Sequence, residues 1–124
     1  MALCFSCGEI KHGAFCPCPK CRVESSGDSG LDITFSDHNL DLETLKEFGN
    51  VIRAIHKCST DPGTRFWAFL HFISEHHSDI LRVELHPEMK VKVMDALRGV
   101  TLPSVTLRLS PMRRHSAREP DDDA

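Results

Sequence analysis

Residues 4–21 read CFSCGEIKHGAFCPCPKC and contain five of the six cysteines in the chain. Four of these form two pairs, each with a spacer of two residues: Cys4 and Cys7, then Cys18 and Cys21. A short spacer lets both sulfurs of a pair turn toward one point, so two such pairs can supply the four ligands of a tetrahedral ion. The spacing therefore predicts one structural metal site at the start of the chain.

Zinc is the ion that this ligand set favours, and we expect one structural Zn²⁺. Disulfides are not expected, because the N-terminal residues show no signal peptide and five clustered thiols cannot all pair with one another. Iron also binds four thiolates, so the sequence leaves that alternative open. Two further residues could replace one of the four ligands, namely Cys16, two positions before Cys18, and His12.

The two cysteine pairs lie in the stretches Cys4-Phe5-Ser6-Cys7-Gly8 and Cys18-Pro19-Lys20-Cys21. Both stretches resemble the metal-binding turns, or knuckles, of zinc ribbons and rubredoxin-like sites. The resemblance covers only about twenty residues, and residues 30–111 resemble no family. It implies a small zinc-knuckle module that needs its ion to fold. Four thiolates leave no open coordination position, so a catalytic zinc is not expected.

The 124 residues carry a formal net charge of -3, which argues against coating of nucleic acid by charge alone. Positive charge is concentrated in residues 98–118, which contain five arginines and no acidic residue. No apolar run is long enough for a membrane helix. Because no signal peptide is present, we expect an intracellular protein, cytoplasmic or nuclear, without membrane contact.

The chain is expected to have four parts. Residues 1–24 form the zinc-binding module, and residues 25–30, which are small and polar, form a flexible linker. Residues 31–110 carry periodic apolar patterns and form an α+β domain. Residues 111–124 form a disordered tail that is first basic and then acidic.

Alternating apolar and polar residues predict strands at residues 31–35, 81–85 and 105–109. Helices are predicted from Asp41 to about residue 57, from Asp61 to about residue 77, and from Pro87 to about residue 97. Strands with one wet face fit a sheet that helices cover on the other side. The expected fold class is α+β in two layers, with a three-stranded, mostly antiparallel sheet, about three helices and the knuckle module in front.

The leading functional interpretation is an intracellular zinc-binding protein that acts as a protein-interaction or regulatory adaptor. Its module is expected to expose four contact residues, of which two are aromatic: Phe5, Ile10, Phe15 and Lys20. The first alternative is a nucleic-acid-binding regulatory protein, in which these aromatic rings stack on bases and cations contact phosphates. The cations would come from residues 98–118 and from the module: Lys11, Lys20 and Arg22.

The second alternative is an enzyme. His71 and Glu75 are four positions apart in a predicted helix and share a face, and Cys58 is the one cysteine outside the cluster. The sequence contains no H-E-x-x-H zinc motif, nucleophile elbow or phosphate-binding glycine loop. We therefore do not expect catalysis, and a cleft that gathers His71, Glu75 and another polar group would be the feature in favour of it.

Overall fold

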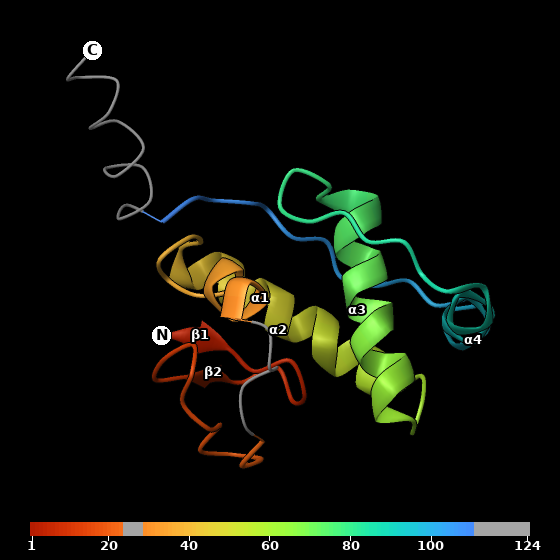
Figure 1. Ribbon diagram of the computed structural model, residues 1–124, viewed down its shortest axis with the longest axis horizontal. Coiled ribbons are helices and arrows are strands. Elements are labelled where there is room, and N and C mark those ends of the chain that lie inside the picture. The colour runs from red at the N-terminus through yellow and green to blue at the C-terminus, as the bar shows by residue number, and fades with distance from the viewer. Residues whose placement is uncertain (24–28, 111–124) are drawn as a thin grey trace.

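The computed structural model describes residues 1–23 and 29–110 (Figure 1). Within them the chain forms a two-stranded sheet and four helices, which is consistent with a mixed α+β class. The elements are β1 (Ala2–Leu3), β2 (Ile10–Lys11), α1 (Ser29–Thr34), α2 (Leu42–His56), α3 (Pro62–His76) and α4 (Pro87–Ala96). β1 and β2 pair antiparallel, with Leu3 opposite Ile10. None of these helices is both long enough and apolar enough to cross a membrane.

The three longer helices begin where the sequence predicts. Asp41 caps α2, because its side chain accepts a hydrogen bond of 2.8 Å from the N–H of Thr44. Asp61 caps α3 in the same way. α4 begins with Pro87, and Gly99 takes a positive φ of 72° just beyond its end. The predicted positions of these helices are thus confirmed.

The predicted three-stranded sheet is wrong, and residues 31–35 show one reason. Residues 31–34 belong to α1, and Phe35 follows directly after its end. Leu31 and Phe35 contact the core, whereas Ile33 is 42% exposed. A strand would place Ile33 and Phe35 on the same side. Alternation over only five residues fits one helical turn as well as a strand, because residues four apart share a helix face.

Residues 81–85 and 105–109 are extended, but neither segment forms a strand. Their side chains alternate between partly buried and exposed positions, as predicted. Leu109 makes an isolated bridge to Leu40. The Thr44 hydroxyl in the first turn of α2 accepts from the N–H of Arg108 at 3.0 Å, so a side chain takes the place of a neighbouring strand. Each of the two segments packs separately on the helices, and the two do not pair with each other.

The core joins the cysteine segment to the helices. Leu3 of β1 is 1% exposed and packs in one cluster with Phe48 of α2 and Phe69 of α3. Phe5 is partly buried, and its ring centroid lies 5.4 Å from that of Phe35 and 6.0 Å from that of Phe69. Figure 1 shows β1 and β2 lying beside α2. The cysteine segment therefore obtains its apolar contacts from the helices.

Three of the four predicted parts extend beyond the described residues. The zinc-binding module does so by its last residue, 24. Of the predicted linker, residues 25–28 lie outside them, and Ser29 and Gly30 begin α1. The predicted tail, residues 111–124, also lies outside them. The division of the chain into four parts stays a prediction.

Candidate metal centre

The two cysteine pairs lie in backbone turns of the same geometry. The N–H of Gly8 donates to the Cys4 carbonyl at 3.0 Å, and the N–H of Arg22 donates to the Cys18 carbonyl at 2.8 Å. The first cysteine of each pair also donates its N–H to the carbonyl five positions further on, at 2.9 and 3.0 Å. The residue after each pair has a positive φ, 81° at Gly8 and 64° at Arg22. Both pairs therefore form knuckles, with Arg22 in a position that suits glycine.

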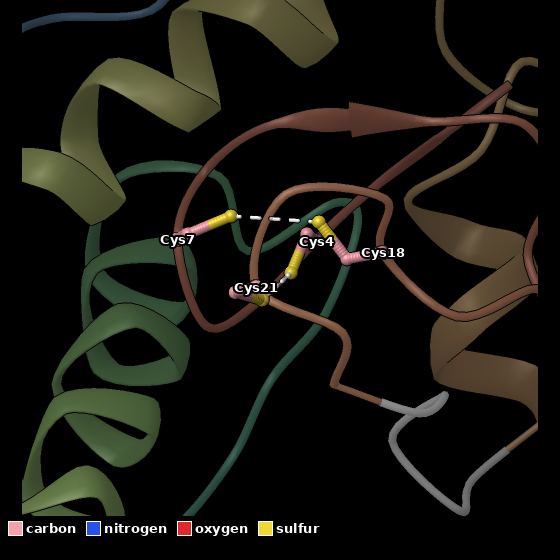
Figure 2. Close-up of side chains that lie close together, drawn as sticks. All are labelled: Cys4, Cys7, Cys18 and Cys21. Carbon is pink, nitrogen blue, oxygen red and sulfur yellow. Dashed lines mark hydrogen bonds between the residues drawn. The ribbon is translucent and has the colours of Figure 1, made fainter.

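The side chains of the two knuckles point into one common space (Figure 2). Four sulfurs all lie within 4.8 Å of one another, those of Cys4, Cys7, Cys18 and Cys21. Two contacts join one knuckle to the other, because the sulfurs of Cys4 and Cys21 are 3.6 Å apart, as are those of Cys7 and Cys18. A tetrahedron with zinc–sulfur bonds of about 2.3 Å has edges of about 3.8 Å. The cluster fits such a tetrahedron and can hold a metal ion.

Backbone N–H groups face these sulfurs and favour their ionised form. Burial by itself would raise the pKa of the Cys18 thiol, but the N–H groups of Cys21 and Lys20, with the neighbouring thiols, lower that pKa to about 7. Burial raises the pKa of Cys4 despite two N–H donors at the same positions of its own knuckle. Burial also raises the pKa of Cys7. A bound cation would supply the positive charge that favours ionisation of these two thiols, whose pKa values burial has raised.

The first knuckle lies directly against α2. Gly8 and Gly49 approach so closely that a Cβ atom on either residue would overlap the carbonyl group of the other. Arg53, one turn further along α2, donates from Nη1 to the Gly8 carbonyl at 3.1 Å. The sequence reveals neither contact. Its one signal is a glycine inside a helix, where glycine costs about 1 kcal/mol relative to alanine.

The two substitute ligands lie outside the cluster of four sulfurs. Cys16 is exposed, and its sulfur is not among those that converge. His12 is also exposed and does not join the cluster. The structure therefore brings together the preferred set of cysteines, and it leaves Cys16 as a free thiol at the surface of the module. Metal binding by the four stays a prediction at this point.

A separate cleft gathers the residues considered for catalysis. It has a volume of about 880 Å³ and lies between the ends of α3 and α4 and residues 100–105. His71 and Glu75 line it, with His71 Nε2 4.0 Å from Glu75 Oε1. His77 also lines it, and burial, together with the neighbouring histidine, lowers the pKa of His77. Cys58 does not line this cleft. His71 and His77 thus line this cleft, whereas Cys58 lies elsewhere in the structure.

The residues considered for nucleic-acid binding are only partly available at the surface. Lys11 is 4% exposed, and its ammonium group donates to a backbone carbonyl at 3.2 Å. The Lys20 ammonium lies 3.4 Å from the Glu9 carboxylate. Phe5 packs against the core rings instead of standing free to stack on a base. Of the arginine-rich segment, residues 111–118 lie outside the described residues.

No protein-family model, curated protein or solved structure matches this chain. Its function is therefore inferred from the chemistry of the cysteine cluster and from the surfaces around it.

Proposed function

We propose that this chain is a zinc-binding adaptor in which one structural Zn²⁺, held by Cys4, Cys7, Cys18 and Cys21, fixes a surface for a protein partner. The convergence of these four sulfurs within 4.8 Å of one another carries the proposal. Zinc takes four thiolates in a tetrahedron, and such sites are structural. The thiols stay available for the ion in a reducing compartment, which agrees with an intracellular protein.

The geometry favours a structural ion over a catalytic one. Cys4 is 3% exposed and Cys18 is 1% exposed, so the two buried ligands shield the ion from water. Four protein sulfurs also complete its coordination, which leaves no position for a reacting water molecule. The ion would hold the two knuckles together and, through Gly8, hold them against α2.

The exposed apolar side chains of the module supply the partner surface. Phe15 lies between the knuckles and is 56% exposed, and Val23 follows the second knuckle and is 44% exposed. Aromatic side chains are enriched in the cores of protein interfaces, whereas a single exposed valine is common on any surface. Phe15 is therefore the residue on which the adaptor role depends most.

Metal analysis of the purified protein tests the centre. We expect about one zinc per chain, and we expect Cys18→Ser to lose it because the variant keeps only three thiolates. Cys16→Ser and Cys58→Ser are matched controls, since both thiols lie outside the cluster. Protein without stoichiometric metal, or equal metal loss in Cys16→Ser, would contradict the assignment. Iron in place of zinc would keep the ligands and replace the ion.

The adaptor role needs a second experiment. Protein partners are captured from a cell extract with wild-type chain, with chelator-treated chain and with Phe15→Asp. A partner that is lost in both of the last two supports a metal-fixed surface at Phe15. Capture that is unchanged in both contradicts it. If the captured species is nucleic acid, its affinity falls steeply with added salt, by about one log unit per log of salt for each phosphate contacted.

The cleft at the end of α3 favours a second candidate function, the binding of a small ligand. Its volume of about 880 Å³ is in the range of small-molecule sites. Its apolar lining includes Phe72 and Leu102, and His71 and Glu75 supply polar groups. Amide NMR shifts during a screen of small molecules would test this site. Shifts confined to its lining residues support the candidate, and a screen without any such shifts removes it.

A further inference from the structure

The segment between α3 and α4 has the pattern of a strand, but it pairs with no strand among residues 1–23 and 29–110. Figure 1 shows residues 81–86 as an extended stretch that leads into α4. Leu81, Val83 and Leu85 are partly buried against the core, and Arg82 and Glu84 are exposed. This two-residue period is that of a strand with one face on a core and one in water.

One edge of the segment is already satisfied by α3. The Ser74 hydroxyl accepts from the N–H of Val83 at 3.2 Å and donates to the Val83 carbonyl at 3.4 Å. Both backbone polar groups of Val83 therefore point toward α3. In an extended chain the N–H and C=O of consecutive residues point to opposite edges. The backbone groups of Arg82 and Glu84 consequently point away from Ser74.

That second edge is open. Within residues 1–23 and 29–110, no hydrogen bond is made by the backbone N–H or C=O of Arg82 or Glu84. Their side chains make no ion pair in the same part of the chain. An exposed edge of this kind is a template for another strand. Its charges restrict which strand can pair with it.

We propose that a second copy of this chain pairs with this edge, antiparallel and centred on Val83. In that register Arg82 of one copy is opposite Glu84 of the other, and Glu84 is opposite Arg82. A two-fold axis thus places both residues beside an opposite charge, as a symmetric interface requires. Opposite charges across a strand pair stabilise it, and like charges destabilise it.

The same register agrees with the hydrogen bonds. In an antiparallel pair, residues that exchange both backbone bonds alternate with residues that exchange none. Here Arg82 and Glu84 form the two bonded pairs, and Val83 faces its own copy in a non-bonded pair. Val83 can keep its two backbone hydrogen bonds to Ser74, because in this register its N–H and C=O bond to no group of the second copy.

The side chains divide between two faces in the dimer. Val83 faces Val83 of the second copy, and Leu81 faces Leu85, all on the side that each copy turns toward its core. The two arginine–glutamate pairs lie on the outer side. This pairing is smaller than the interface of about 1,000 Å² that a stable dimer buries, so the dimer is expected to be in reversible equilibrium with the monomer. It does not involve the cysteine cluster and does not depend on the proposed function.

Sedimentation of the purified protein, from micromolar to millimolar concentration, tests the dimer. Wild-type chain should shift from monomer to dimer over this range. Arg82→Glu places two carboxylates opposite each other at both pairs, and Glu84→Arg does the same with two guanidinium groups. Each variant should raise the dissociation constant about tenfold or more. Thermal unfolding of each variant checks that the fold is kept, because exposed substitutions change stability little.

Two combinations separate strand register from general charge effects. An equimolar mixture of the two single variants should form a heterodimer, because every cross-strand pair then joins opposite charges. The exchange variant Arg82→Glu/Glu84→Arg should dimerise like the wild type. Lys46→Glu on the exposed side of α2 is the control and should change nothing. A wild-type chain that stays monomeric over the whole concentration range would overturn the proposal. So would single variants with the same dissociation constant as the wild type, or a mixture of the two that does not associate.

Discussion

The backbones of Gly8 and Gly49 lie in direct contact, so the first knuckle and α2 touch without an intervening side chain at this point. Gly8 has a φ of 81°, which glycine adopts without strain. Gly49 has an ordinary helical position, and its lack of a Cβ atom serves only the close approach. A glycine that weakens a helix is here the residue that lets the first cysteine knuckle pack against α2.

Gly49→Ala should destabilise the protein by about 1–3 kcal/mol, because the added Cβ would overlap the Gly8 carbonyl and force the knuckle away from α2. Chemical denaturation of the zinc-loaded protein measures this change. Gly63→Ala in the first turn of α3 is the matched control, since its Cβ would meet no atom closer than 3.8 Å. The control should be neutral or stabilise by up to about 1 kcal/mol. Equal effects of the two variants would contradict the contact.

Phe5→Ala should cost about 2–3 kcal/mol, somewhat less than a fully buried phenylalanine, because Phe5 packs on Phe35 and Phe69 while remaining partly exposed. Phe15→Ala in the same module should change stability by no more than about 0.5 kcal/mol, since that ring is 56% exposed. Thermal unfolding with zinc present compares the two. A larger loss at Phe15 would mean that the module does not pack on the helices as described.

Arg22→Gly should stabilise the protein by about 0.5–1 kcal/mol. Arginine at a φ of 64° carries a strain of about 1–2 kcal/mol, and the greater freedom of glycine in the unfolded chain offsets part of the gain. Arg22→Ala keeps the strain and should give no gain. Denaturation midpoints of the zinc-loaded proteins measure these changes. A loss of stability in Arg22→Gly would show that the arginine side chain contributes more to stability than its backbone strain costs.

Acid should destabilise the fold partly through His77. Burial, together with the neighbouring His76, lowers its pKa below the ordinary value of 6.5. The unfolded chain therefore takes up this proton first, and stability decreases as the pH falls below about 6.5 until the folded-state pKa is passed. His77→Phe should weaken this pH dependence and keep the ring packing on Phe48. Both proteins are unfolded with the same excess of zinc, because acid also protonates the thiolates.

The helices could be predicted from sequence because their signals extend over several turns. The stripe of α2, which includes Leu45, Phe48, Ile52 and Ile55, repeats along its whole length, and Asp41 marks its start. The strands could not be predicted in the same way. Residues 31–35 alternate for too few positions, and the helical turn that buries Phe35 is chosen by the surrounding rings. Residues 81–85 are extended as predicted, but pairing depends on a neighbour that alternation cannot identify.

The set of four cysteines could be predicted from sequence for a related reason. Convergence of the sulfurs depends on the spacing of the cysteines inside each turn, and this spacing can be read directly from residues 4–21. Docking of the knuckles on the helices depends on residues far apart in sequence, such as Arg53 and Gly8, which are 45 positions apart. The inward orientation of Phe5 has the same origin. From one sequence, an aromatic residue beside a cysteine fits a surface contact as well as a core contact.

Phe5 joins the first knuckle to the aromatic cluster, because its ring packs on those of Phe35, Phe66 and Phe69. If the first knuckle needs the proposed zinc ion to close, a newly synthesised chain without that ion would leave these three rings open on that side. Chaperones and proteases recognise such surfaces, and they remove chains that linger in open states. The amount of this protein in a cell would then follow the supply of zinc at the ribosome, even if its gene were transcribed at a constant rate.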